Sequence, residues 1–196
     1  MHASDSLRLY REIGDPLSSL GSQVRIGLAR VNLGEYDQAR GDLLQALRMA
    51  DELTGDWRAY GKAYASRWLG IADLRQGHFE RSLEYFQAVM RQAAEVPDYA
   101  WIATGLGLSA CVLAKQCRPV RAATLSGAAV ALYAKGDREP WEDSSLDTLL
   151  PGWRDRQDRE TILQAFEAGR AMNPDQALTY ALNGAGHDSV KDKNIL

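Results

Sequence analysis

The feature that most constrains this chain is an internal repeat. The segments Leu33–Ala39 and Gln76–Ser82 share one pattern of glycine, polar, aromatic, two polar residues and a small residue, and their glycines, Gly34 and Gly77, are 43 residues apart. Self-similarity at a fixed period of this size is typical of chains in which each unit buries its apolar face against the next. The repeat therefore predicts a stack of similar units.

Each repeat predicts a pair of helices. Apolar residues recur at helical spacing after each aromatic, over residues 36–50 and 79–93, and also before each glycine, over residues 17–31 and 64–74. Spacings of three, four and seven keep one helix face apolar. A sharp turn between two helices favours glycine because its φ can be positive. We therefore expect an A helix, a turn at glycine and a B helix in each unit.

A third, degenerate unit follows the first two. Its A helix is predicted from near Asp98 to Lys115 and its B helix from Pro119, so Cys117 takes the position of the turn glycine, 40 residues after Gly77. Proline suits the first turn of a helix, where its missing N–H has no partner to lose. Residues 4–15 resemble a B helix without an A helix, which leads us to expect a chain that starts inside a longer array.

The C-terminal part predicts helices over 146–156 and 161–172 and a last helix that Asn173 caps and Pro174 begins. Residues from Asn183 onward are small, polar or charged almost to the end, and we expect a frayed or disordered tail. We expect a single repeat domain over 1–183, with a tail over 184–196. Within it we place a partial repeat at 3–14, repeats at about 16–54, 57–96 and 98–135, and C-terminal helices at about 144–183.

These helix pairs resemble the tetratricopeptide repeat. Its core positions are matched by Leu69 and Gly70 with Gly77, Phe79, Ser82 and Phe86, and less fully by Ile26 and Gly27 with Gly34, Tyr36, Ala39 and Leu43. The period is longer than the ~34 residues of that repeat, and Arg30 and Asp73 stand where an aromatic residue is usual. The resemblance implies an all-α superhelix of antiparallel helix pairs with a C-terminal helical cap.

A second resemblance concerns the end of the chain. Residues 121–129, 166–172 and 176–182 are similar to the C-terminal end of bacterial multidomain transcriptional regulators of the LuxR type and of related ATPase-containing (STAND-like) proteins. This resemblance implies a non-catalytic arm that binds a protein, a peptide or a small-molecule effector, while the ATPase and DNA-binding parts lie elsewhere. The alternative is a structural module that only mediates self-association as a homo-oligomer.

Charge and hydropathy narrow the setting. The net charge is −3, so this segment lacks the strong basic field that holds a nucleic-acid backbone. No apolar run approaches the ~18 residues of a membrane span, and the first residues lack the apolar core of a secretory signal. We expect a cytoplasmic protein that contacts neither nucleic acid nor membrane directly.

No pattern in the sequence predicts catalysis, so we expect no enzyme, no cofactor and no metal. The segment 55–63 differs from a phosphate loop because five residues separate its glycines and Ala63 replaces the magnesium-binding hydroxyl. The three histidines, His2, His78 and His187, do not have zinc-ligand spacing. Cys111 and Cys117 fit neither a zinc motif nor a redox motif, and we expect both to be reduced.

In a right-handed superhelix the inner face would come from the A helices. When equivalent positions of the repeats are aligned, the candidate binding residues that fall on this concave face mix apolar and basic character. They are Val24, Leu28, Asn32, Tyr64, Arg67, Ile71, Arg75, Cys111 and Lys115. Such a surface could accept an acidic or C-terminal peptide or a packed helix, or it could simply be a solvated face. The Asn and Lys pattern with which chaperone-binding repeats hold a terminal carboxylate is not reproduced.

Overall fold

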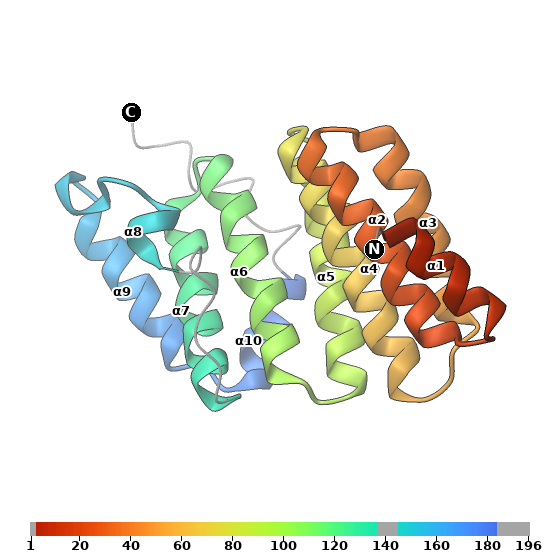
Figure 1. Ribbon diagram of the computed structural model, residues 1–196. Helices are drawn as coiled ribbons and strands as arrows, with labels where there is room; N and C mark the ends of the chain where they lie inside the picture. Colours follow the sequence, from red (N-terminus) through yellow and green to blue (C-terminus); the bar gives the residue numbers. More distant parts are fainter. Residues whose placement is uncertain (1–2, 137–144, 184–196) are drawn as a thin grey trace. The chain divides into compact units, whose positions relative to one another are not determined.

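The computed structural model describes residues 3–136 and 145–183 (Figure 1). Within these residues the regular structure is entirely helical and contains no strand, so the predicted all-α class is confirmed. Contacts divide the chain into two compact units, Met1–Trp101 and Ile102–Leu196, and each is described by itself. The boundaries of the single domain expected from the sequence stay a prediction.

Unit 1 is built from five consecutive helices, each packed against the next. They are α1 (Ala3–Glu12), α2 (Pro16–Leu33), α3 (Tyr36–Asp51), α4 (Asp56–Arg75) and α5 (Phe79–Glu95). The A helices α2 and α4 also pack against each other, as in a row of antiparallel helix pairs (Figure 1). Two of the predicted repeats therefore coincide with the pairs α2–α3 and α4–α5.

Unit 2 contains the third pair and the C-terminal helices. Its elements are α6 (Tyr99–Lys115, which the unit boundary crosses), α7 (Pro119–Lys135), α8 (Leu146–Leu149), the 3-10 turn η2 (Trp153–Asp155), α9 (Arg159–Arg170) and α10 (Pro174–Asn183). Both α9 and α10 pack on α7. The expected tail over 184–196 and the polar stretch with Pro140 and Trp141 lie outside the described residues.

One helix prediction was wrong in extent. Instead of a helix over 146–156, the chain forms one turn of helix in α8, breaks at Pro151, and forms one 3-10 turn in η2. Proline disfavours helical backbone in the residue before it, and Gly152 adopts a positive φ of 74°. The apolar pattern indicated a continuous helix, but these two residues interrupt it.

The three predicted turns share one geometry. Gly34, Gly77 and Cys117 all have positive φ, at 80°, 77° and 58°. After each of them, the backbone N–H of the next residue donates to a carbonyl five residues earlier, at 2.9 Å in every case: Glu35 to Arg30, His78 to Asp73 and Arg118 to Leu113. This is the Schellman ending of a helix. The place of Cys117 in the turn-glycine position is thereby confirmed.

Replacing Cys117 by glycine should stabilise unit 2. An L-residue in left-handed backbone costs about 1–2 kcal/mol relative to glycine, and the extra freedom of glycine in the unfolded chain offsets part of this. We expect Cys117→Gly to raise the free energy of unfolding by up to about 1 kcal/mol, measured by urea denaturation. The reciprocal control, Gly77→Ala, should lower it; a destabilised Cys117→Gly would contradict the interpretation of the turn.

Glycines in the A helices receive large side chains of neighbouring helices. A methyl group added at Gly27 would lie 2.6 Å from Cγ of Leu43, and one at Gly70 would overlap the ring of Phe86. Leu43 and Phe86 are fully buried on the B helices. Next to this contact, the Ser82 hydroxyl donates to the carbonyl of Gly70 at 2.9 Å. The glycines therefore let A and B helices approach closely at equivalent points of the two repeats.

In unit 2 the closest approach is between two backbones. A Cβ atom on Gly127 of α7 would overlap the carbonyl oxygen of Phe166, and one on Gly169 of α9 would overlap the carbonyl oxygen of Thr124. Each glycine thus lies against the backbone of the helix that carries the other glycine. Because backbone atoms cannot rotate away as side chains do, this crossing requires glycine at both positions.

Gly127→Ala should therefore destabilise the α7–α9 packing. We expect a loss of about 1–3 kcal/mol, the typical cost of overpacking a closely packed interface, measured by urea denaturation followed by circular dichroism. Gly41→Ala is a matched control because Gly41 is an exposed helical glycine with open space around its Cα, and alanine there should stabilise by roughly 0.5–1 kcal/mol. Equal effects of the two variants would contradict the crossing.

Candidate functional site

The predicted binding residues fall in both units. Seven lie on α2 and α4 of unit 1, whereas Cys111, half-buried, and Lys115, exposed, lie on α6 in unit 2. The strip formed by the seven and their neighbours on α2 and α4 is called the A-helix face.

Two of the seven do not belong to an accessible surface. Val24 has no exposed area and Ile71 is also buried, so both contribute to the core. The reason is that α2 and α4 pack against each other as well as against B helices, which leaves only a narrow strip of each A helix for solvent. The alignment of repeat positions assigned these two residues to the face without allowing for the packing of α2 against α4.

The other residues remain accessible, and the structure joins two of them. Leu28, Tyr64 and Arg67 are half-buried, while Asn32 and Arg75 are exposed. The Arg75 guanidinium donates to the side-chain oxygen of Asn32 and to the carbonyl oxygen of Val31, each at 3.0 Å. These bonds connect the C-terminal ends of the two A helices.

Aromatic side chains extend this face toward the start of α4. Tyr64 meets Trp101 edge to face with ring centroids 6.2 Å apart, and Trp57 lies 6.1 Å from Tyr60. The Tyr60 hydroxyl donates to Asp98 at 3.2 Å. Trp57 is 57% exposed, which is unusual for so large an apolar side chain. The sequence prediction missed Trp57, Tyr60 and Trp101 as face residues, although spacings of three and four along α4 could have indicated the first two.

A cation lies beside this aromatic cluster. The Arg67 guanidinium carbon is 5.5 Å from the centre of the Trp68 ring, within cation–π range.

The A helices of unit 1 are basic overall: α2 carries Arg25 and Arg30 and no acid, and α4 carries four basic residues against Asp56 and Asp73. The B helices α3 and α5 each carry three acids against two arginines. Three of the A-helix bases, Arg30, Arg58 and Lys62, pair with acids of α3, and the cations of the A-helix face are Arg67 and Arg75.

Behind the face, Arg30 and its counterpart 43 residues later, Asp73, form ion clusters of opposite sign. Arg30 donates to Asp42 of α3 at 2.7 Å and lies 3.8 Å from Glu35. The side-chain amide of Gln23 donates to the other oxygen of Asp42 at 3.2 Å. In the first repeat a cation is thus surrounded by acids.

The second repeat inverts this arrangement. The carboxylate of Asp73 is fully buried and accepts hydrogen bonds through Oδ1 from Arg40 of α3 at 2.5 Å and from Arg81 of α5 at 2.8 Å. His78 Nδ1 lies 3.4 Å from the same oxygen and 2.5 Å from Arg81. Burial lowers the pKa of Arg40, but the hydrogen bond and charge of Asp73 together raise it above the ordinary value. Asp73 therefore connects three helices.

Asp73→Asn should be destabilising. Removing the acid takes the common partner away from Arg40, which is 27% exposed, and from Arg81, which is 50% exposed; because solvent reaches both, we expect a loss of about 1–3 kcal/mol. Urea denaturation should show this loss. Asp51→Asn provides the control because Asp51 pairs with Lys62 and Arg58 at the surface, where solvent screens the pairs, and its denaturation midpoint should barely change. A mild Asp73→Asn variant would contradict the role of this cluster.

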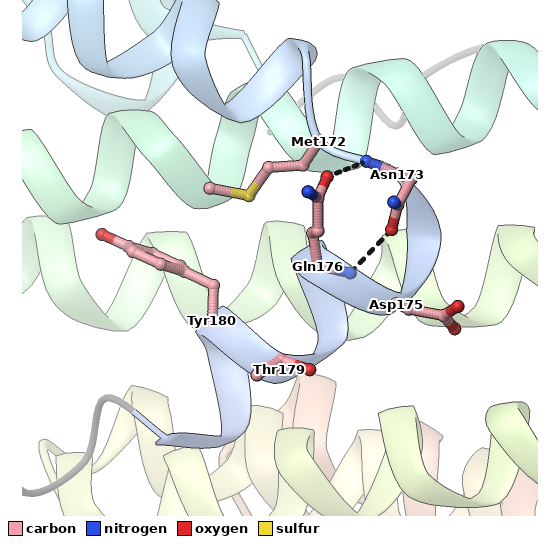
Figure 2. A pocket seen from close by; sticks show the side chains of 6 residues that line it. All are labelled: Met172, Asn173, Asp175, Gln176, Thr179 and Tyr180. Atoms are coloured by element: carbon pink, nitrogen blue, oxygen red, sulfur yellow. Dashed lines mark hydrogen bonds between the residues drawn. The ribbon is translucent and has the colours of Figure 1, made fainter.

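Unit 2 carries a separate shallow cavity of about 490 Å³ along α10 (Figure 2). Its lining residues are Met172, Asn173, Asp175, Gln176, Thr179 and Tyr180. Asn173 and Gln176 form a reciprocal capping box, in which each side-chain oxygen accepts from the other residue's backbone N–H at 2.9 Å. The predicted cap at Asn173 is confirmed. The Arg121 guanidinium lies 5.7 Å from the centre of the Tyr180 ring.

The carboxylate of Asp147 holds together the short elements α8 and η2. Asp147 accepts a hydrogen bond from the Trp153 indole at 3.0 Å and is paired with Arg154, whose guanidinium also covers the Trp153 ring. The hydrogen bond from Arg154, followed by that from Trp153, lowers the pKa of Asp147. Trp153 is buried with Ala123, Leu146 and Ile162. Trp153 therefore belongs to the core, whereas Asp147 and Arg154 are exposed.

Among the described residues, no group of three or more His, Cys, Asp or Glu side chains is placed to hold a metal ion. No helix in the described part of the chain is both long and apolar enough to cross a membrane. Comparison with protein-family models, with curated proteins and with solved structures gives no match. The described structure defines an all-α protein of helices packed consecutively on their neighbours, with a cationic, aromatic A-helix face.

Proposed function

We propose that the chain is a non-catalytic interaction module of the tetratricopeptide type that binds a protein or peptide segment on the A-helix face of unit 1. The observation that carries this proposal is the run of accessible aromatic and cationic side chains along α4, from Trp57 through Tyr64 to Arg67. Tryptophan, tyrosine and arginine are the residues that most often dominate the energy of protein interfaces.

The charge of the face favours an acidic segment as ligand. Basic residues predominate on α2 and α4, and the acids on them are Asp56 at the start of α4 and Asp73, which is buried in its own ion cluster. A bound peptide with acidic residues beside an aromatic or leucine side chain would match both the cationic and the apolar parts of the strip.

We further propose that this module is the C-terminal arm of a bacterial transcriptional regulator and acts in the cytoplasm without contacting DNA itself. The support is the resemblance of three C-terminal segments to such regulators. Two of these segments, 121–129 and 166–172, contain the glycines that pack against each other in the α7–α9 crossing. The close approach of α7 and α9 requires glycine in both segments, which gives a physical reason for the two to occur together.

Binding to a matched pair of peptides tests the ligand class. The probes are two fluorescein-labelled 15-residue peptides with the same leucine and tryptophan positions, one with glutamates and one with lysines between them. Fluorescence anisotropy with the full chain should show binding of the acidic peptide at least about tenfold tighter than binding of the basic one.

Two variants locate the binding on the face. Trp57→Ala and Arg67→Gln should each weaken binding of the acidic peptide by about fivefold or more, since interface tryptophan and arginine residues typically contribute over 1 kcal/mol. Arg91→Gln, an exposed arginine on the B helix α5 that bonds Gln87, is the matched control and should leave the affinity unchanged. Tighter binding of the basic peptide, or an equal loss in the control, would refute the proposed face.

A further inference from the structure

The start of α4 carries two aromatic rings with a carboxylate beside them. Trp57 is 57% exposed, and its ring is tilted by 54° to that of Tyr60, with the centroids 6.1 Å apart. The Tyr60 hydroxyl donates to Oδ2 of Asp98 at 3.2 Å, while Oδ1 of Asp98 accepts the backbone N–H of Ala100 at 3.0 Å. Trp57, Tyr60 and Asp98 are called the Trp57 cluster. The carboxylate of this cluster is held in place next to the rings.

The charged residues at this end of α4 favour a cation beside the cluster. Helical spacing places Asp56 about 40° from Tyr60 around the axis of α4. Arg58 and Lys62 lie two residues before and after Tyr60, which places them about 160° away, on the other side of the helix. Both bases pair with Asp51 of α3, at 3.3 and 2.6 Å. The side of α4 that carries the cluster is therefore acidic at this end.

Unit 2 shows how a similar arrangement holds a cation. The Trp153 indole donates to Asp147, and the Arg154 guanidinium lies 4.8 Å from the centre of the Trp153 ring while it pairs with the same carboxylate. The cation is thus attracted by a ring face and by a carboxylate together. The Trp57 cluster likewise combines an aromatic donor with its carboxylate, and it adds the exposed ring of Trp57.

Further along α4 the A-helix face has the opposite charge. Arg67 and Arg75 follow Tyr60 by seven and fifteen residues, which is about 10 Å and about 22 Å along the helix axis. Both lie within about 60° of Tyr60 around that axis. The face therefore changes from acidic and aromatic at the start of α4 to cationic toward its end.

We propose that the Trp57 cluster binds a lysine or arginine side chain of the same peptide whose acidic residues lie beside Arg67 and Arg75. This inference rests on the proposed binding of a peptide to the A-helix face and specifies the ligand as a segment with opposite charges in separate parts. An extended chain advances about 3.3 Å per residue, so the cation and the nearest acid of the ligand are about three residues apart.

Three fluorescein-labelled peptides test the inference with the full chain. The parent peptide has glutamates in its middle and a lysine three residues beyond them at each end, so that either chain direction can place a lysine on the cluster. One counterpart has norleucine for both lysines, and the other has glutamine for the glutamates. Fluorescence anisotropy should show the parent binding at least about fivefold tighter than the norleucine peptide. Equal binding of these two would overturn the proposal.

Variants assign the preference for lysine to the Trp57 cluster. Asp98→Asn removes the charge but keeps a residue that caps a helix equally well, and Trp57→Leu keeps an apolar side chain without the aromatic face. Each should reduce the preference to about twofold or less. The matched control is Asp37→Asn, which removes an exposed acid from the first turn of α3 and should leave the preference unchanged. Circular dichroism should show all three variants folded. A preference that persists in Asp98→Asn and Trp57→Leu, or falls equally in the control, would refute the assignment.

The glutamine peptide separates this inference from the proposed function. If the lysines strengthen binding but the glutamates do not, the cation site is supported and the acidic ligand class is refuted. If the glutamates strengthen binding but the lysines do not, the cation site is refuted and the acidic ligand class is supported. Binding of none of the three peptides would refute both.

Discussion

The close approach of helices at glycine is the constraint on which the rest of this structure depends. At Gly27 and Gly70 the side chains of Leu43 and Phe86 fill the space that a Cβ would need, and at Gly127 and Gly169 the backbone of the facing helix fills it. Helix separation sets which residues remain at the surface. The glycine contacts therefore fix the core of each helix pair, and the packing of α2 against α4 makes the A-helix face too narrow to include Val24 and Ile71.

Much of the fold could be predicted because the determinants of helix ends are local. A left-handed residue after an A helix, a proline at the start of α7 and the side chain of Asn173 each act within a few residues, so the turn at Cys117 and the cap of α10 could be recognised by position. The period of the apolar pattern then identified the helix pairs. The break at Pro151 is also visible in the sequence, but the apolar pattern on both sides of it favours a continuous helix.

The candidate site was harder to predict because accessibility is a property of packing between helices distant in sequence. Aligning equivalent positions of the repeats places a residue on one side of a helix, but it does not show whether another helix covers that side. For the same reason it missed the contact of Tyr64 with Trp101, whose positions are 37 residues apart. The reciprocal crossing of Gly127 and Gly169, 42 residues apart, could likewise not be seen in the sequence.

The opposite signs of the two ion clusters have a consequence for how such an array can lengthen. Arg40 of the first pair reaches into the second pair to bond Asp73, the counterpart of Arg30. If the first pair were duplicated in tandem, Arg40 of one copy would meet Arg30 of the next, and two guanidinium groups would share a site that buries a carboxylate now. Asp42 and Glu35 of that copy, at the places of Tyr85 and His78, would be the acids left to pair with both guanidinium groups.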